Sequence, residues 1–360
     1  MTDYLIVGLG LAGISLCEVL ERNNRTFQVV SDTSQTASMV AGGLYNPVNL
    51  KRFSLVWNAQ EQLRKAMPFY AHLETKLKLS LDQKIPVYRR FASIEEQNMW
   101  FEASDTPPLR PFLSSQIHLN TNPHIHAPYG FGEVLQTGRI DTKTLLTGYR
   151  QYLRDRKLLR EESFLFDGLQ VNKEGVRYGD ITAKNLVFAM GYGQDHNPFF
   201  QYLPLTGTKG ELLTIKAADL KERNVIKSSI FVIPLGHDLY RIGATYKWKD
   251  KTNLPTAESR AELLDKLNTF LTCDYEVVDH VAGIRPTVTD RRPLVGRHPE
   301  IANLYVMNGL GSRGVMIAPT VAEQLYSHIE NGTPLDPEMD IARFTKKHFS
   351  PSSSRHGGHM

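Results

Sequence analysis

Apolar and polar positions alternate along this chain in two rhythms, one typical of helices and one typical of strands. A short apolar run over residues 3–7 precedes a glycine-rich turn and a helical pattern over residues 14–22. A second apolar run, FQVV at residues 27–30, completes the pattern of a βαβ unit. A long helical pattern follows over residues 58–78, and we expect Pro68 to break it because proline lacks a backbone donor.

The middle of the chain changes character between residues 80 and 130, where six prolines interrupt short alternating runs such as PVYRRF. We interpret this stretch as strands and loops, because alternation with period two is typical of strands. From residue 210 onward, ELLTI, IFVIP and LYRIGATY are separated by turn residues, which predicts an antiparallel meander. Further helices are predicted over residues 141–154, 255–271 and 315–331, and further strands over residues 168–176, 186–189 and 303–306.

Because these two kinds of pattern alternate along the chain, we expect two interleaved domains. One is an α/β domain, and the other is mainly antiparallel sheet of the α+β type. The final stretch, PSSSRHGGHM, is rich in small and polar residues, which predicts a disordered tail. The expected boundaries are residues 1–78, 130–207 and 280–347 for the α/β domain, 79–129 and 208–279 for the sheet domain, and 348–360 for the tail.

Composition places the chain among ordinary globular proteins, with 41% hydrophobic and 22% charged residues in a total of 360. The net charge of +4 permits an anionic partner, but typical nucleic-acid modules are more basic. Cys17 and Cys273 lack metal-ligand spacing, so we expect neither a metal site nor a disulfide framework. No segment approaches the roughly 18 apolar residues of a membrane helix, and no signal-peptide pattern is present. We therefore expect a cytoplasmic location and no membrane partner.

The opening sequence YLIVGLGLAG places three glycines in the G-x-G-x-x-G spacing of dinucleotide-binding proteins. Gly8 allows a tight turn, Gly10 lets the backbone approach a pyrophosphate, and Gly13 lets the helix pack closely on the strand. The pyrophosphate would lie at the positive end of the helix dipole. The second strand ends in Ser31 and Asp32, and either residue has the spacing of a ribose partner. A glycine-rich turn in another α/β fold is the alternative.

Several segments, taken in order, resemble the D-amino-acid oxidase superfamily of flavoproteins, in its glycine oxidase and sarcosine oxidase branch. The resemblance implies a Rossmann-type FAD-binding domain interleaved with a substrate-binding sheet domain. It also implies oxidation of a carbon–nitrogen bond of an amino acid or small amine, with molecular oxygen as the usual electron acceptor. The segments are GLGLAG, TASMVAGGLYNP, GRIDTKTLL, LVFAMGYG, PLTGTKGELLTI, IFVIPLGHDLYRIGAT, GIRPTVTDRRPLVGRHP, NLYVMNGLGSRGVMIAPTVAEQL and DIARF.

The resemblance also implies which residues contact FAD. Some members carry a cysteine that tethers the flavin, but the matching segment GLGSRG has none, so FAD is expected to bind non-covalently. Beyond the fingerprint glycines, the implied contacts are Leu11, Ala12, Ser31, Asp32, Ala37, Ser38, Gly42, Gly43, Leu44, Val171, Gly191, Gly309, Gly311, Ser312, Arg313, Gly314, Val315 and Met316.

A second glycine-rich turn, NGLGSRG, directly precedes the last predicted helix. Its glycines would let the backbone pass close to the isoalloxazine ring. The positive end of the helix beginning near Val315 would then stabilise the anionic reduced flavin. Arg313, within this turn, is expected either near the flavin or the pocket mouth, or in a purely structural role.

Four further residues are candidates for the substrate side. Arg285 in GIRPT offers a planar bidentate fork for a carboxylate, the role that the resemblance implies for it; a structural salt bridge is the alternative. The resemblance places Phe231 and Tyr246 in the pocket wall. Phe231 lacks the hydroxyl that some relatives use to bind the carboxylate, and Tyr246 is a candidate replacement. Arg241 falls near a lysine that assists oxygen reduction in sarcosine oxidases, or else points outward.

Two other functions stay open at this stage. The segments LGSRG and SMVAGGLYNP also resemble the FAD domain of a bifunctional enzyme that removes a carboxymethyl group from a modified wobble uridine, which would make tRNA a partner. A dehydrogenase subunit of an electron-transfer complex is disfavoured, because no iron–sulfur cysteine set is present. His196, His237 and His298 lie in predicted turns and are expected at the surface. The sequence carries no signal for an oligomeric state.

Overall fold

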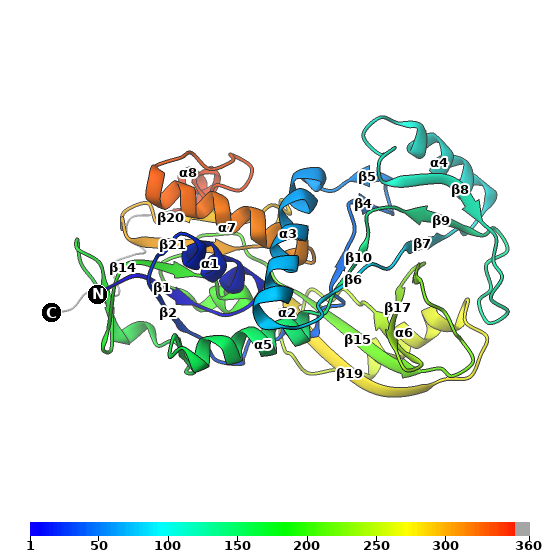
Figure 1. Ribbon diagram of the computed structural model, residues 1–360, viewed down its shortest axis with the longest axis horizontal. Helices are drawn as coiled ribbons and strands as arrows, with labels where there is room; N and C mark the ends of the chain where they lie inside the picture. The colour runs from blue at the N-terminus through cyan, green and yellow to red at the C-terminus, as the bar shows by residue number, and fades with distance from the viewer. Residues whose placement is uncertain (350–360) are drawn as a thin grey trace.

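The computed structural model describes residues 1–349 and contains two large sheets, each assembled from segments that are far apart in the sequence (Figure 1). The first sheet has a parallel core, and antiparallel strands extend it. The parallel strands lie in the order β11 (Leu159–Arg160), β2 (Phe27–Val30), β1 (Thr2–Val7), β14 (Ile181–Phe188) and β21 (Leu304–Asn308), and the antiparallel ones are β12 (Leu169–Val171), β13 (Val176–Tyr178) and β20 (Leu294–Arg297).

The pairing of β1 with β2 around α1 (Leu11–Arg22) confirms the predicted βαβ unit. The single strand predicted over residues 168–176 is wrong. The chain turns there, because the Asn172 side chain accepts the backbone N–H groups of Glu174 and Gly175 and thereby separates β12 from β13.

Helices that contact one another cover the first sheet. α1 packs against α7 (Gly314–Asn331), and α3 (Ala59–Leu77) packs against α7 and α5 (Thr142–Asp155). α7 ends where predicted, at Gly332, which adopts a left-handed conformation with φ of 67°.

Pro68 does not break α3, so that expectation was wrong. The buried side chains Leu63, Ala66, Tyr70 and Leu73 recur at helical spacing on both sides of it and keep the helix packed. Pro68 lies on the exposed side, where water can satisfy the carbonyl that loses its partner.

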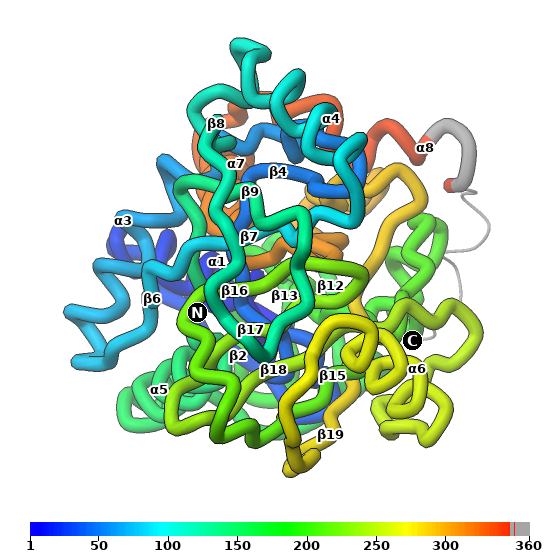
Figure 2. Tube along the Cα trace, turned by 90° about the vertical axis from the view of Figure 1, so that its right-hand side faces the viewer, coloured from blue at the N-terminus to red at the C-terminus, as the bar shows by residue number. Residues whose placement is uncertain are grey.

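The second sheet occupies the other end of the molecule (Figures 1 and 2). α6 (Ala257–Asn268) packs on one face of this sheet, through Leu263 and Leu267. The opposite face is turned toward the first sheet. The strands lie in the order β19 (Glu276–Arg285), β15 (Thr208–Lys216), β18 (Leu239–Gly243), β17 (Phe231–Gly236), β16 (Val225–Lys227), β7 (Val87–Arg90), β9 (Phe131–Val134) and β8 (Leu113–His118).

The region predicted as strands and loops also contains a helix, α4 (Ile94–Asp105). The sequence pattern that predicts this helix is a capping box at its N-terminus, which is easily missed because the surrounding region is rich in proline. The Ser93 hydroxyl accepts the Glu96 backbone N–H at 3.3 Å, and the Glu96 carboxylate accepts the Ala92 backbone N–H at 2.7 Å. The buried Trp100 anchors this helix against Phe91.

The strands of the second sheet extend past two predicted domain boundaries, although the division into two domains itself stays a prediction. β9 lies beyond residue 129, and β19 crosses residue 279 without interruption because it pairs with β15 from Lys216 opposite Glu276 to Thr208 opposite Arg285. α8 (Ala342–His348) reaches into the predicted tail, whose remaining residues 350–360 lie outside the described part of the chain. No helix within residues 1–349 has the length and apolarity needed to cross a bilayer.

Short elements connect the two sheets. The four-residue helix α2 contacts both α5 and β19. The remaining short elements of the chain are α2 (Ala37–Val40), β3 (Leu44–Tyr45), β4 (Val48–Asn49), β5 (Ser54–Leu55), β6 (Asp82–Gln83), β10 (Gly138–Ile140), and the 3-10 turns at Phe166–Gly168 and Gly191–His196.

A buried carboxylate ties together three of the helices that cover the first sheet. Glu18 on α1 accepts a hydrogen bond from the Tyr149 hydroxyl on α5 at 2.6 Å and pairs with Lys76 on α3. Lys76 also pairs with Glu21 at 2.6 Å, and the Tyr152 hydroxyl donates to Glu21 at 2.5 Å. Because a buried charge needs several partners, this network fixes how the three helices pack.

We predict that Tyr149→Phe lowers the free energy of unfolding by about 1.5–3 kcal/mol, since it removes a hydrogen bond to a buried carboxylate. Tyr152→Phe is the matched control, because it removes the same kind of bond from the more exposed Glu21, and we expect it to cost less than about 1 kcal/mol. Urea denaturation followed by circular dichroism measures both. Equal losses would show that Glu18 is not the centre of the network.

Candidate functional site

A cavity of about 1680 Å³ is lined by residues of both sheets. One side is formed by the turn after β1 and by the start of α1, at the carboxyl edge of the parallel strands, where ligands bind in open α/β sheets. The other side is formed by the second sheet, on the face that Gly210, Leu212 and Phe231 share. The cavity therefore includes both the edge of the first sheet, where the sequence predicts cofactor binding, and the face of the second sheet, where it predicts substrate binding.

The first glycine turn is built as the fingerprint predicts. Gly13 lies away from the cavity, and a Cβ there would meet the Gly8 carbonyl oxygen at 2.1 Å, so its role is close packing. A Cβ on Gly10 would meet only the Ser38 side chain, with its hydroxyl at 3.2 Å and its Cβ at 3.9 Å, so Gly10 keeps open space on the cavity side. Ser38 supports the start of α1 by accepting the Leu11 backbone N–H at 3.3 Å.

Ser31 and Asp32 both line the cavity, but their contacts differ. The Ser31 hydroxyl accepts the Leu9 backbone N–H at 3.1 Å and so supports the glycine turn. Burial acts to raise the pKa of Asp32, but hydrogen bonds from Ser163 and Ser34 outweigh it and hold the pKa below its usual range. Asp32 thus supplies the ionised acceptor that a ribose hydroxyl would need, and the geometry favours it over Ser31.

The second glycine turn lies beside the first sheet's carboxyl edge as well. The Asn308 side chain donates to the Gly191 carbonyl at 2.8 Å and ties this turn to the segment after β14. The Gly311 backbone N–H donates to the Pro286 carbonyl at 3.1 Å. α7 begins at Gly314, and the helix runs for 18 residues, so its positive end faces the cavity wall that Gly314 and Val315 form.

The structure brings most of the predicted site residues together around this cavity and leaves four away from it. The residues that line it are Gly8, Gly10, Leu11, Ala12, Ser31, Asp32, Ala37, Ser38, Gly42, Gly43, Leu44, Gly191, Phe231, Tyr246, Arg285, Gly311, Ser312, Arg313, Gly314, Val315 and Met316. Those that do not are Gly13, Val171, Arg241 and Gly309.

Three of these four residues lie elsewhere than the sequence interpretation placed them. Val171 packs in the apolar cluster of β12 and β14, and Phe164 and Phe166 line the cavity instead. Arg241 lies 3.7 Å from Asp279 across the second sheet, so its predicted place beside the flavin is not supported. Gly309 abuts Val288 and Leu294, and a Cβ there would lie 2.7 Å from the Val288 side chain.

Arg285 is held flat against the second sheet. It projects over Gly210, where a Cβ would fall 2.0 Å from its Nη2 atom. Its Nη1 donates to the Thr245 carbonyl at 3.2 Å, and its guanidinium carbon lies 4.4 Å from the centre of the Tyr246 ring. Burial lowers the pKa of Arg285. Within residues 1–349 no carboxylate pairs with it, so this cation is available to a bound anion.

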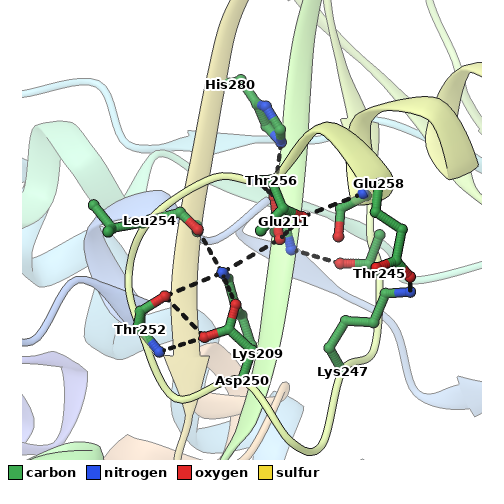
Figure 3. Close-up of polar contacts among 12 residues, drawn as sticks. Lys209, Glu211, Thr245, Lys247, Asp250, Thr252, Leu254, Thr256, Glu258 and His280 are labelled. Atoms are coloured by element: carbon green, nitrogen blue, oxygen red, sulfur yellow. Dashed lines mark hydrogen bonds and ion pairs between the residues drawn. The ribbon is translucent and has the colours of Figure 1, made fainter.

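A buried polar network lies beneath Arg285, on the opposite face of β15, and sequence reasoning missed it (Figure 3). Lys209 is fully buried, pairs with Asp250 at 2.5 Å and Glu211 at 3.4 Å, and donates to the Leu254 carbonyl. Glu211 accepts the Thr256 backbone N–H at 2.8 Å and lies 2.9 Å from the His280 Nε2 atom. Its only sequence signal is a Lys and a Glu two residues apart on one strand.

This network positions the cavity wall that the second sheet forms. The Glu211 backbone N–H donates to the Thr245 hydroxyl at 2.9 Å, and Thr245 in turn supports Arg285 through its carbonyl. Lys209 and Lys247 exchange two backbone hydrogen bonds of 2.9 Å on either side of Thr245 and Tyr246. Hydrogen bonds from Lys209 and Glu211 therefore hold the short segment that carries Tyr246 against β15.

Arg313 is a second cation on the cavity wall. Burial lowers its pKa, and within the described residues its side chain makes no hydrogen bond or ion pair. Arg285 and Arg313 together give the cavity a positive interior, which suits a carboxylate or an anionic cofactor group. Of the two roles left open for Arg313, the structure favours a place at the cavity over a structural ion pair.

The three histidines that the sequence placed in turns differ in their exposure to solvent. His196 and His237 are exposed as expected, although His196 also borders the cavity. His298 is buried, so the surface expectation for it was wrong. Its Nδ1 accepts the backbone N–H groups of Glu300 and Ile301 at 3.2 and 3.1 Å, which makes it a turn-forming residue, and burial lowers its pKa.

These features fit FAD. The first glycine turn and the α1 N-terminus would hold the pyrophosphate, Asp32 a ribose, and the second glycine turn with the α7 N-terminus the isoalloxazine ring. Neither Cys17 nor Cys273 lines the cavity, which agrees with non-covalent binding. Within residues 1–349 no group of three or more His, Cys, Asp or Glu side chains is arranged to hold a metal ion.

Comparison with known proteins shows the family. A family model described as FAD dependent oxidoreductase (DAO) matches residues 3–327, so the chain belongs to this family and FAD is its cofactor. Among solved structures, glycine oxidase from Bacillus cereus ATCC 14579 superposes with a TM-score of 0.78 over 94% of this chain and 99% of that chain, at 19% identity. This likeness confirms the predicted fold class.

Two curated relatives are similar in sequence. Glycine oxidase of Bacillus subtilis (strain 168) is 25% identical over 221 residues, which are 57% of this chain and 59% of that protein. The tRNA 5-methylaminomethyl-2-thiouridine biosynthesis bifunctional protein MnmC of Aromatoleum aromaticum is 30% identical over 181 residues, which are 44% of this chain and 28% of that protein. The chain thus spans less than two thirds of the length of either relative.

Two glycine variants separate cofactor binding from folding. We predict that Gly10→Ala leaves the unfolding transition of the FAD-free protein nearly unchanged but weakens FAD binding at least tenfold, because the added methyl group occupies the space of the pyrophosphate. Gly13→Ala, the matched comparison, should instead destabilise the FAD-free protein, because its Cβ collides with backbone. Flavin absorbance after dialysis and thermal melts of the FAD-free protein measure the two effects. Equal melting temperatures for both variants would contradict the packing role of Gly13.

Proposed function

We propose that this protein oxidises the carbon–nitrogen bond of an amino acid or a small amine that carries a carboxylate, with molecular oxygen as the electron acceptor. The observation that carries this proposal is Arg285. It is a half-buried arginine without a carboxylate partner in residues 1–349, held flat by Gly210, Thr245 and Tyr246 at the wall of the FAD cavity. A planar fork so presented is complementary to a substrate carboxylate.

The protein's task in this reaction is to bind and orient. Oxidation to an imine removes two electrons and two protons from the substrate, one from Cα and one from the nitrogen, and water then hydrolyses the imine. FAD, when bound, supplies the acceptor for the two electrons. Arg285 would fix the carboxylate, while Tyr246 and Phe231 would line the cavity beside it and limit the orientations that the substrate can adopt.

Removal of a carboxymethyl group from a modified wobble uridine in tRNA is the second candidate. The 30% identity to the bifunctional tRNA biosynthesis protein favours it. The adduct in such a substrate is an N-substituted glycine, so Arg285 would bind its carboxylate in the same way. The two candidates differ in what is attached to the nitrogen.

Anaerobic reduction separates these candidates. We expect glycine, sarcosine or D-alanine to bleach the flavin absorbance of the purified holoenzyme, since each presents a carboxylate next to an oxidisable amine. Readmitting oxygen should restore the colour and release hydrogen peroxide. Bleaching only with tRNA that bears the carboxymethylaminomethyl group would assign the second candidate. A flavin that none of these compounds reduces would refute the proposed function.

Replacing Arg285 tests the substrate anchor. We predict that Arg285→Ala raises KM for the reducing amino acid by about 100-fold with FAD retained, because the carboxylate loses a charge-assisted partner. Arg285→Lys should recover only part of this loss, since an ammonium cannot make the bidentate contact. Arg241→Ala is the control, because Arg241 is a half-buried arginine on the same sheet that does not reach the cavity, and the KM of this variant should stay unchanged. Equal changes in KM for the Arg285 and Arg241 variants would refute the role of Arg285.

A further inference from the structure

Several further cations line the cavity, and one of them, Lys227, takes no part in the proposed reaction. It ends β16, opposite Phe231 on β17 and opposite Arg89 on β7. Its Nζ lies 5.6 Å from the centre of the Phe231 ring, on the cavity side of the sheet. Lys227 therefore lies on the substrate side, among the strands of the second sheet, far along the cavity from the first glycine turn.

Lys227 is left without a counter-ion although its neighbours have theirs. Arg89 pairs with Glu96 at 2.5 Å, and Lys266 pairs with Glu262 at 2.6 Å. Within residues 1–349 the Lys227 ammonium makes neither an ion pair nor a hydrogen bond. Burial, with the nearby Arg89 and Lys266, lowers the pKa of Lys227 to about 8. A half-buried cation beside two like charges is unfavourable unless an anion joins it.

The cavity around Lys227 opens toward solvent. Ser228 and Ser229, at the turn after β16, and Thr269, after α6, also line it, and Ser229 and Thr269 are exposed. A ligand bound here can therefore extend outward. The ribose and pyrophosphate sites lie on the first sheet, so FAD phosphates do not account for the cation at this end.

The spacing between Lys227 and Arg285 sets the size of such a ligand. The Arg285 guanidinium lies over Gly210 on β15 and reaches the segment that follows β18, so it is two to three strands away from β16. Because neighbouring strands are about 4.8 Å apart, the two cations are separated by on the order of 10 Å. Glycine and sarcosine carry one carboxylate and are much shorter than this, so neither satisfies both cations.

We propose that Lys227 is a second anion-binding subsite and that the substrate is an N-substituted amino acid whose second arm ends in a carboxylate or phosphate about 10 Å from the first carboxylate. This inference rests on the proposed function, because it assumes that Arg285 binds the first carboxylate. The arm would leave the nitrogen, pass over the Phe231 ring and meet the Lys227 ammonium near the open end of the cavity.

Binding without turnover tests the subsite first. Octanedioate and octanoate share a chain length, but only octanedioate has a second carboxylate at a matching distance. Titration of the holoenzyme, followed by the perturbation of the flavin absorption spectrum, should give a Kd at least tenfold lower for octanedioate. Lys227→Met should abolish that preference, and Lys227→Arg should retain it. Lys221→Met, which removes an exposed lysine paired with Asp238 outside the cavity, should leave it intact.

Anaerobic stopped-flow reduction then tests the substrate class. N-butylglycine, N-(3-carboxypropyl)glycine and N-(3-phosphonopropyl)glycine have arms of similar length that end in a methyl, a carboxylate or a phosphonate. We expect the two anionic arms to raise the ratio of reduction rate to Kd at least tenfold over the butyl arm. Lys227→Met should reduce all three ratios to the butyl value, and the carboxylate and phosphonate arms identify which anion the subsite prefers.

These experiments distinguish a failure of the Lys227 subsite from a failure of the proposed oxidation. Equal affinity for octanedioate and octanoate in the unaltered protein, or an equal loss for both in Lys227→Met, would overturn the subsite. So would a Lys227→Met defect confined to reoxidation by oxygen, because it would place the lysine at the cofactor. If octanedioate is preferred through Lys227 but no N-alkylglycine reduces the flavin, the subsite stands and the proposed oxidation fails.

Discussion

The cost of burying positive charge without a carboxylate partner is the constraint on which this site depends. Removing an ion from water costs several kcal/mol even after the protein relaxes. Arg285 recovers part of this cost from the Thr245 carbonyl and the face of the Tyr246 ring, both of which are neutral. The remainder is available to an anionic ligand, which gains a contact that water no longer screens. Charge that is paired within the protein, as in Lys209 with Asp250, lies on the other face of the same strand.

The alternation of side chains along β15 is what keeps these two kinds of charge apart. Gly210 faces the cavity and leaves room for the Arg285 guanidinium, while Lys209 and Glu211 face away and hold the loop that carries Thr245. A shift of one residue in the pairing would exchange the two sets. The long ladder between β15 and β19 makes such a shift costly.

Much of this arrangement was predictable from sequence, because it rests on local patterns. The strand–turn–helix at Gly8 to Arg22 and the last helix up to Gly332 follow from apolar periodicity and from glycine placement. The predictions failed where tertiary packing decides. Pro68 is tolerated because the opposite side of α3 is buried, and α4 forms because Ser93 and Glu96 cap each other within a proline-rich region. Arg241 shows why the role of a site residue is harder to predict than its strand. The sequence predicts the strand that contains Arg241, but its neighbour Asp279 lies on another strand, and only the folded structure brings the two together.

At Arg285 and Pro286 the chain passes from the second sheet to the glycine turn near the first sheet, and this junction affects how the substrate specificity of the fold can change. Arg285 ends the last strand of the second sheet, and the very next residue accepts a hydrogen bond from the glycine turn at Gly311. A substitution that moves the backbone at Pro286 therefore disturbs the glycine turn and the position of Arg285 together. β16 and β17 contribute Lys227 and Phe231 to the same cavity from strands that do not contain this junction. During evolution, new substrate preferences can accumulate on those strands while the redox centre stays intact, which makes them the adaptable part of the enzyme.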